Sequence, residues 1–319
     1  MQCIFCLQEI TDKNSCREHI IPKSIGGSWT TNSVCKTCNS DFGQSVDSLI
    51  IDHALIIQKR REFDLAGNTG KIPALFNQGK MGDNYEFDIE IQHGRNGKIK
   101  QYFIRPQGNI SGPEHDLKLR CIMDEKLERH ATSILRQKAS ELGCKISEEQ
   151  LGEISFRKAL LDSGIAVDIP IDAKNYNRGL LKIAYETTHE WLGKKYLSDP
   201  TGKLIKEIVM DAERFDSLEQ IFPGGILSRL NPQQKGLFGQ WRNSPNCHVI
   251  FLDSFQDALI CHIRLFSVIE GLIRVSNQPQ AYRFFEPTYL ICDPTTRKFN
   301  SHLFDTYNYK RLWHDMKLF

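Results

Sequence analysis

The chain has 319 residues, of which 40% are hydrophobic and 25% charged, the composition of an ordinary globular protein. Its net charge of +2 excludes the strongly basic balance of a molecule that binds nucleic acid over its whole surface, so any such surface must be local. No apolar run reaches the length that spans a bilayer, and the first residues lack the apolar segment of a secretory signal, so we expect a cytoplasmic protein without membrane association.

Two Cys-x-x-Cys pairs lie near the start of the chain, Cys3 with Cys6 and Cys35 with Cys38. In a cytosolic protein, cysteines paired at this spacing indicate metal ligands in preference to disulfides. Four thiolates from two such pairs match the ligand set of a closed tetrahedral zinc site. The 28 residues between the pairs, 7–34, are more than a compact zinc ribbon holds, so a further element must fold between them.

The residues between and after the pairs predict a strand, a loop and a helix. Cys16–Pro22 has the pattern of a short strand that ends at proline. Ile25–Ser28 contains two glycines and predicts a loop. Beyond Asn39, apolar residues recur at the three- and four-residue spacing of a helix.

This order of elements resembles the zinc-bound HNH endonuclease family, which is built on a ββα-metal core. The resemblance rests on the Glu-His-Ile-Ile-Pro string, the Gly-Gly loop and the Cys-x-x-Cys-Asn string, which occur in the family's order. It implies a structural zinc on four cysteines and a phosphodiester-cleaving site on the other matching residues. The matching positions are Cys3, Cys6, Glu18, His19, Asn32, Cys35, Cys38 and Asn39.

The residue types suit the hydrolysis of a phosphodiester. A neutral imidazole can take a proton from water near pH 7, which makes His19 the candidate general base. The resemblance implies that Glu18 and Asn39 hold a catalytic divalent ion and that Asn32 braces the loop and orients the histidine. Oxygen ligands favour a hard cation, Mg²⁺ or Mn²⁺, with Ni²⁺ as a further candidate. The family's most quoted pattern has Asp and His where this chain has Glu18 and Asn39, which leaves the identity of the ion open.

Several of these polar residues are also suited to other roles. Asn32 and Asn39 suit a turn or a helix N-cap, and Glu18 with His19 suits an ordinary strand pair in a zinc module without catalysis. Arg17 and Lys23 are the candidates for contacts with phosphates. The basic cluster at residues 59–61 either pairs with the dipole at a helix C-terminus or contacts phosphate.

Residues 66–319 contain no further motif that indicates a chemistry. Residues 87–104 alternate as a hairpin does, and 121–142 has a helical pattern. A better helix is predicted at 172–196, with Gly193 near its end. Strands of a packed sheet are predicted at residues 248–252, 258–266, 272–275 and 288–292.

We therefore expect an α+β protein with an HNH module at residues 1–65, followed by a mixed α/β region of unassigned fold at 66–319. The second region would serve target recognition, sensing or oligomerisation, because a bare HNH core selects its substrate poorly.

The leading hypothesis is a metal-dependent endonuclease that acts on DNA. An N-terminal HNH module joined to a further domain resembles restriction and anti-phage nucleases, which suggests a defence role with partner proteins. Cleavage of both strands by one site per chain favours a homodimer or two successive nicks. Two alternatives remain: a zinc-stabilised nucleic-acid-binding protein without catalysis, and an RNA-cleaving nuclease on the same scaffold.

Overall fold

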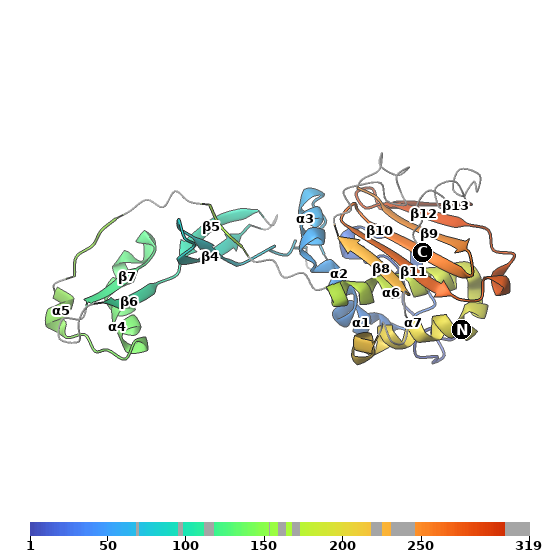
Figure 1. Ribbon diagram of the computed structural model, residues 1–319, viewed down its shortest axis with the longest axis horizontal. Helices are drawn as coiled ribbons and strands as arrows, with labels where there is room; N and C mark the ends of the chain where they lie inside the picture. The colour runs from blue at the N-terminus through green and yellow to red at the C-terminus, as the bar shows by residue number, and fades with distance from the viewer. Residues whose placement is uncertain are drawn as a thin grey trace. The chain divides into compact units, whose positions relative to one another are not determined.

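The computed structural model describes residues 1–67, 70–94, 98–111, 118–152, 154–158, 164–167, 173–217, 225–230 and 246–303. The chain divides into two compact units (Figure 1). The first, unit 1, is discontinuous and comprises residues 1–73 and 171–319, whereas unit 2 is the inserted segment 74–170. The described residues combine helices and strands, which confirms the predicted α+β class.

The N-terminal part of unit 1 consists of short elements in the predicted order. A two-stranded antiparallel ladder pairs β1 (Glu18–His19) with β2 (Thr30–Thr31). Between them, the 3₁₀ turn η1 (Lys23–Ile25) ends at Gly26, whose positive φ of 90° suits glycine. Three helices follow: α1 (Lys36–Ser45), α2 (Asp47–Ile51) and α3 (Ala54–Glu62).

The C-terminal part of unit 1 is an antiparallel sheet. In the part of the chain that the structure describes, it has the strand order β13-β12-β9-β10-β11-β8. The strands β9 and β10 are buried on both faces, as the continuous apolar runs predict. The strands are β8 (Ile226–Leu230), β9 (His248–Phe255), β10 (Ala258–Leu265), β11 (Ile269–Ser276), β12 (Thr288–Asp293) and β13 (Lys298–Leu303).

Two helices, α6 (Ala173–Leu192) and α7 (Pro200–Met210), cover one face of this sheet and contact β10 and β11 (Figure 1). The helix α6 confirms the helix predicted at 172–196, and Gly193, with a φ of +72°, follows its last residue. Shorter 3₁₀ segments complete this part of the unit, and they are η3 (Gly193–Ser198), η4 (Glu213–Ser217) and η6 (Pro279–Tyr282).

The N-terminal elements and the C-terminal elements share one hydrophobic core. The ring of Phe5 lies 5.1 Å from the ring of Tyr185 on α6, and the Tyr185 hydroxyl donates a hydrogen bond to the carbonyl of Ile4. A Cβ atom on Gly179 of α6 would come within 2.6 Å of Ile50, so only glycine allows the two helices to approach this closely. Residues 1–65 are therefore packed on the C-terminal elements, and their separation as a functional domain stays a prediction.

The described residues of unit 2 form two small antiparallel sheets and two α-helices. The predicted hairpin corresponds to β4 and β5, but the helix predicted at 121–142 begins ten residues late, because Cys121 pairs with Gly108 in a strand ladder. The elements are β3 (Gln78–Met81), β4 (Phe87–His93), β5 (Ile99–Ile104), β6 (Gln107–Ser111), β7 (Lys118–Ile122), η2 (Glu125–His130), α4 (Ala131–Glu141) and α5 (Glu148–Gly152). Among the described residues, no helix combines the length and the apolar character needed to cross a membrane.

Candidate active site and metal centre

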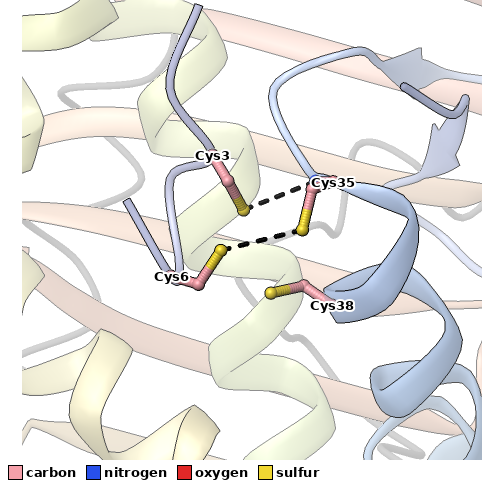
Figure 2. Close-up of side chains that lie close together, drawn as sticks. All are labelled: Cys3, Cys6, Cys35 and Cys38. Atoms are coloured by element: carbon pink, nitrogen blue, oxygen red, sulfur yellow. Dashed lines mark hydrogen bonds between the residues drawn. The ribbon is translucent and has the colours of Figure 1, made fainter. Parts of the chain in front are cut away.

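The structure brings the four predicted cysteine ligands together, as Figure 2 shows. Cys3 and Cys6 lie in a tight turn, in which the amide of Leu7 donates to the carbonyl of Cys3 and Leu7 has a left-handed φ of 61°. Cys35 is the N-cap residue of α1, and Cys38 lies in its first turn. The helix N-terminus therefore presents two sulfur atoms where its dipole favours negative charge.

The geometry of this cluster fits a tetrahedral zinc ion. All four sulfur atoms lie within 4.8 Å of one another, and the Cys6 and Cys35 sulfurs are 3.7 Å apart. Zinc–sulfur bonds of about 2.3 Å in a tetrahedron place neighbouring sulfurs about 3.8 Å apart. Burial raises the pKa of the Cys3 and Cys38 thiols, so a nearby cation is needed to keep all four groups as thiolates. The four cysteines are suited to hold a structural zinc, as predicted.

The strand β1 sends Glu18 and His19 in opposite directions. Glu18 pairs with Thr31 and is only 3% exposed, whereas His19 pairs with Thr30 and is half-buried. Thr31 donates a hydrogen bond to Glu190 of α6 across 2.6 Å, so the Glu18 side of the ladder faces that helix. The alternation of a strand therefore buries the carboxylate and turns the imidazole to the other side.

Glu18 belongs to a buried charge cluster that is centred on Lys182 of α6. The ammonium nitrogen of Lys182 lies 2.5 Å from a Glu18 oxygen, 3.0 Å from Asp47 and 3.5 Å from Glu186. Burial opposes the charge of Lys182, but the three carboxyl groups outweigh it and raise the pKa of the ammonium group. Burial is the largest effect on both Glu186 and Glu18, and it raises the pKa of each carboxyl group.

His19 lies in a neighbourhood of cations. Burial lowers its pKa, and the charges of Lys23, Arg17, Arg297 and Lys182 lower it further. Arg17 and Lys23 are exposed, as residues that meet phosphate must be. At pH 7 the imidazole is therefore mainly neutral and can accept a proton.

Asn39 lies in the first half of α1, where its backbone amide donates to the carbonyl of Cys35. The alternative role of Asn39 as an N-cap is wrong, because the helix begins at Lys36 and Cys35 holds the N-cap position. The side-chain amide nitrogen of Asn39 donates to the sulfur of Cys16 across 3.2 Å, and Cys16 donates to the carbonyl of Val34. The amide nitrogen of Asn39 is therefore engaged by Cys16, and the role of its oxygen as a metal ligand stays a prediction.

Glu18 and Asn39 carry oxygen atoms of the kind that a hard divalent cation prefers, and their role as its ligands stays a prediction. Lys182 pairs with one oxygen of Glu18, and the backbone of His19 also donates a hydrogen bond to this carboxyl group. Three carboxyl groups surround the single ammonium group of Lys182, so the cluster holds more acidic than basic groups. Hard cations such as Mg²⁺ prefer oxygen donors and keep several of their waters, so two protein donors are enough.

Two other predicted residues lie apart from this cluster. Asn32 is exposed directly after β2, and among the hydrogen bonds of the described residues none joins it to His19. In the basic cluster at the end of α3, Arg60 is 2% exposed and its side chain donates to the carbonyl of Leu65. Arg60 is therefore a packing residue and is not available to phosphate.

Three residues outside the sequence motif interact with the predicted site residues. They are Lys182, Arg297 and Cys16. Lys182 lies in a helix of apolar neighbours, where a lysine and a glutamate four residues apart are the one sequence signal of a buried ion pair. Arg297 lies in the turn between β12 and β13 and has no such signal. Cys16 follows the pattern of a small buried residue, and only its contact with Asn39 marks it.

Residues 3–55 match the family model described as HNH endonuclease. The match confirms the resemblance predicted from the Glu-His and Cys-x-x-Cys-Asn strings, and it ends within the N-terminal part of unit 1. A search of curated proteins and a search of solved structures each give no match. The N-terminal residues therefore form an HNH endonuclease module, to which the rest of the chain adds elements of unassigned fold.

Proposed function

We propose that the HNH endonuclease module makes this chain a metal-dependent nuclease that hydrolyses phosphodiester bonds in DNA. The observation that carries this proposal is the placement of His19 within the matched segment, on the side of β1 opposite the buried Glu18. A strand pair in a purely structural zinc module would not require a neutral imidazole among exposed cations.

In the proposed reaction, the His19 imidazole accepts a proton from the attacking water. The water oxygen forms a bond to phosphorus as the bond from phosphorus to the 3′ oxygen breaks. The 3′ oxygen takes a proton from solvent water, which leaves 5′-phosphate and 3′-hydroxyl ends. Glu18 and Asn39 would hold Mg²⁺ or Mn²⁺, with Ni²⁺ as a further candidate. When bound, such an ion neutralises the phosphate and stabilises the leaving oxygen. In this proposal Arg17 and Lys23 contact the phosphates, and Asn32 braces the loop and orients His19.

The test is a supercoiled plasmid incubated with the zinc-loaded protein and Mg²⁺, Mn²⁺ or Ni²⁺. We expect nicked and linear DNA with at least one ion, none in EDTA, and none with His19→Ala, which should keep its zinc. Mobility shifts without nicking would support a zinc-stabilised binding protein instead. Labelled RNA and DNA of one sequence, incubated side by side, distinguish a DNA nuclease from an RNA nuclease on the same scaffold.

The biological setting that we propose is restriction or anti-phage defence in the cytoplasm. One cleavage site per chain requires a homodimer, or two successive nicks, to cut both strands of a duplex. Residues 66–319 would then select the target, and unit 2 is the part best suited to this role because it is a separate compact unit. Plating a phage on bacteria that express the wild type or His19→Ala tests the defence role.

A further inference from the structure

The turn that joins β12 and β13 packs against the glycine loop that follows the Glu18–His19 strand. A Cβ atom on Gly26 would lie 2.4 Å from the Cβ of Pro294, so the two turns are in direct contact. The sulfur of Cys292 lies 3.4 Å from the Ser28 hydroxyl and 3.6 Å from the carbonyl of Gly26. The hairpin therefore forms one packed piece with the loop beside the proposed active site.

A second contact fixes the same loop to the sheet. The ring of His248, at the start of β9, donates from Nε2 to the carbonyl of Ile25 across 2.8 Å. Its other nitrogen, Nδ1, accepts from the amide of Phe266, which sets the tautomer of the neutral ring. The glycine loop is therefore attached to the sheet at two strands, through His248 of β9 and Cys292 of β12. These contacts fix the β12–β13 turn next to that loop.

The turn itself has a defined geometry that exposes one arginine. A carboxylate oxygen of Asp293 accepts hydrogen bonds from both the amide and the hydroxyl of Thr295 and from the amide of Thr296. Arg297 follows in the left-handed region, with a φ of 55°, and is exposed. Glycine or asparagine adopts this backbone at lower cost, so an arginine here has no conformational reason.

The positive charge of Arg297 lies near His19, as do the charges of Arg17 and Lys23. The contact with Pro294 places this turn beside Gly26, whose amide donates to the carbonyl of Lys23. The side chains of Arg297, Arg17 and Lys23 are exposed. Exposed cations on adjoining segments form a positively charged surface, which attracts an anionic ligand.

We propose that Arg297 is a phosphate-binding residue of this site, and that with Arg17 and Lys23 it holds the backbone of a nucleic-acid strand across His19. This inference rests on the proposed function and names a substrate contact supplied by the C-terminal sheet. A guanidinium group binds a phosphate through two parallel hydrogen bonds, which gives it geometric as well as electrostatic selectivity. The C-terminal part of the chain then completes the substrate surface of the HNH module.

The test measures the binding of a fluorescein-labelled 20-base-pair DNA duplex by fluorescence anisotropy at several salt concentrations. All proteins are full-length and carry His19→Ala, so that the duplex stays intact. We expect Arg297→Ala to weaken binding about tenfold and to reduce the slope of log K against log salt by about one, the effect of losing one phosphate contact. The matched control is Arg283→Ala, which removes an exposed arginine directly after η6 and should leave both quantities unchanged.

A second variant separates binding from stability. Arg297→Gly suits the left-handed backbone, so we expect it to melt at or above the temperature of the parent while it binds DNA as weakly as Arg297→Ala. Parent-like affinity and salt slope for both Arg297 variants would overturn the inference, as would an equal loss of binding in Arg283→Ala. If the parent protein fails to bind DNA and the wild type fails to cut it, the proposed function itself is wrong.

Discussion

The cysteine cluster and the Glu18–His19 strand lie in the same module, but they depend on different parts of the chain. The four zinc-binding sulfurs come from residues 3–38, and the contacts that shape the cluster are local. Glu18, by contrast, is paired with Lys182, which lies 164 residues away. A local motif can therefore build the cysteine cluster, whereas the charges around the Glu18–His19 strand come from α6 and from the turn between β12 and β13.

The largest expected effect on stability comes from removing a ligand of the cysteine cluster, the site that depends on local contacts. Cys38→Ser should lose zinc and lower the melting temperature strongly, because structural zinc contributes on the order of 10 kcal/mol to small folds that depend on it. Zinc content by mass spectrometry and thermal unfolding measure both effects. Cys144→Ser, in unit 2, is the control and should keep its zinc and its melting temperature. A Cys38→Ser protein with wild-type zinc and stability would contradict the assignment of this ligand.

The substitution Lys182→Met tests the long-range contact between α6 and the Glu18–His19 strand. Removal of the ammonium group leaves the buried carboxyl groups of Glu18 and Asp47 without their positive partner, which should cost about 3–5 kcal/mol of unfolding free energy. Urea denaturation measures the loss. Lys194→Met, at an exposed position after α6, is the matched control. The zinc should remain bound in both variants, and equal stability of the two would show that the buried cluster does not hold the strand.

A smaller effect on the unfolding free energy is expected from the pH dependence of the contact between His248 and the carbonyl of Ile25. Burial lowers the pKa of His248 to about 4, below the usual value near 6.5 in an unfolded chain. Its contribution is therefore fully present above pH 6.5 and is lost as the pH falls towards 4, up to about 3 kcal/mol.

The matched variant for this prediction is His248→Gln, whose amide can still donate to the carbonyl of Ile25 but does not titrate. The wild type should lose stability relative to this variant between pH 6.5 and pH 4 in urea denaturation. A constant difference between the two across this range would show that His248 does not resist protonation in the folded state.

The sequence predicts the cysteine cluster well, but it does not predict the interactions of Lys182 and Arg297 with the Glu18–His19 strand. The spacing of the two Cys-x-x-Cys pairs is enough to predict the zinc ligands, because each pair spans one turn of the chain: a tight turn for Cys3 and Cys6, and the first turn of α1 for Cys35 and Cys38. The helix after the second pair begins at Lys36, earlier than predicted, because Cys35 takes the N-cap position without a hydroxyl or carboxylate to mark it. Lys182 and Arg297 could not be assigned, because no local pattern connects either residue with the motif.

The sequence pattern also did not predict how the parts of unit 1 pack together. The apolar runs of β9 and β10 predict a buried sheet, but they do not tell that α6 and this sheet pack on residues 1–65. The helix predicted at 121–142 fails at its start because Cys121 is paired in β7, and strand pairing overrides a local helical pattern there.

The central claim is that His19 performs the chemistry while the cysteines and Lys182 only hold its strand. The most direct measurement is the single-turnover rate of DNA cleavage by His19→Ala, with zinc content determined on the same sample. His130→Ala, an exposed histidine of unit 2, is the matched control. We predict a loss of at least about 100-fold for His19→Ala with its zinc retained, and wild-type cleavage by His130→Ala. Wild-type cleavage by zinc-loaded His19→Ala would contradict the account.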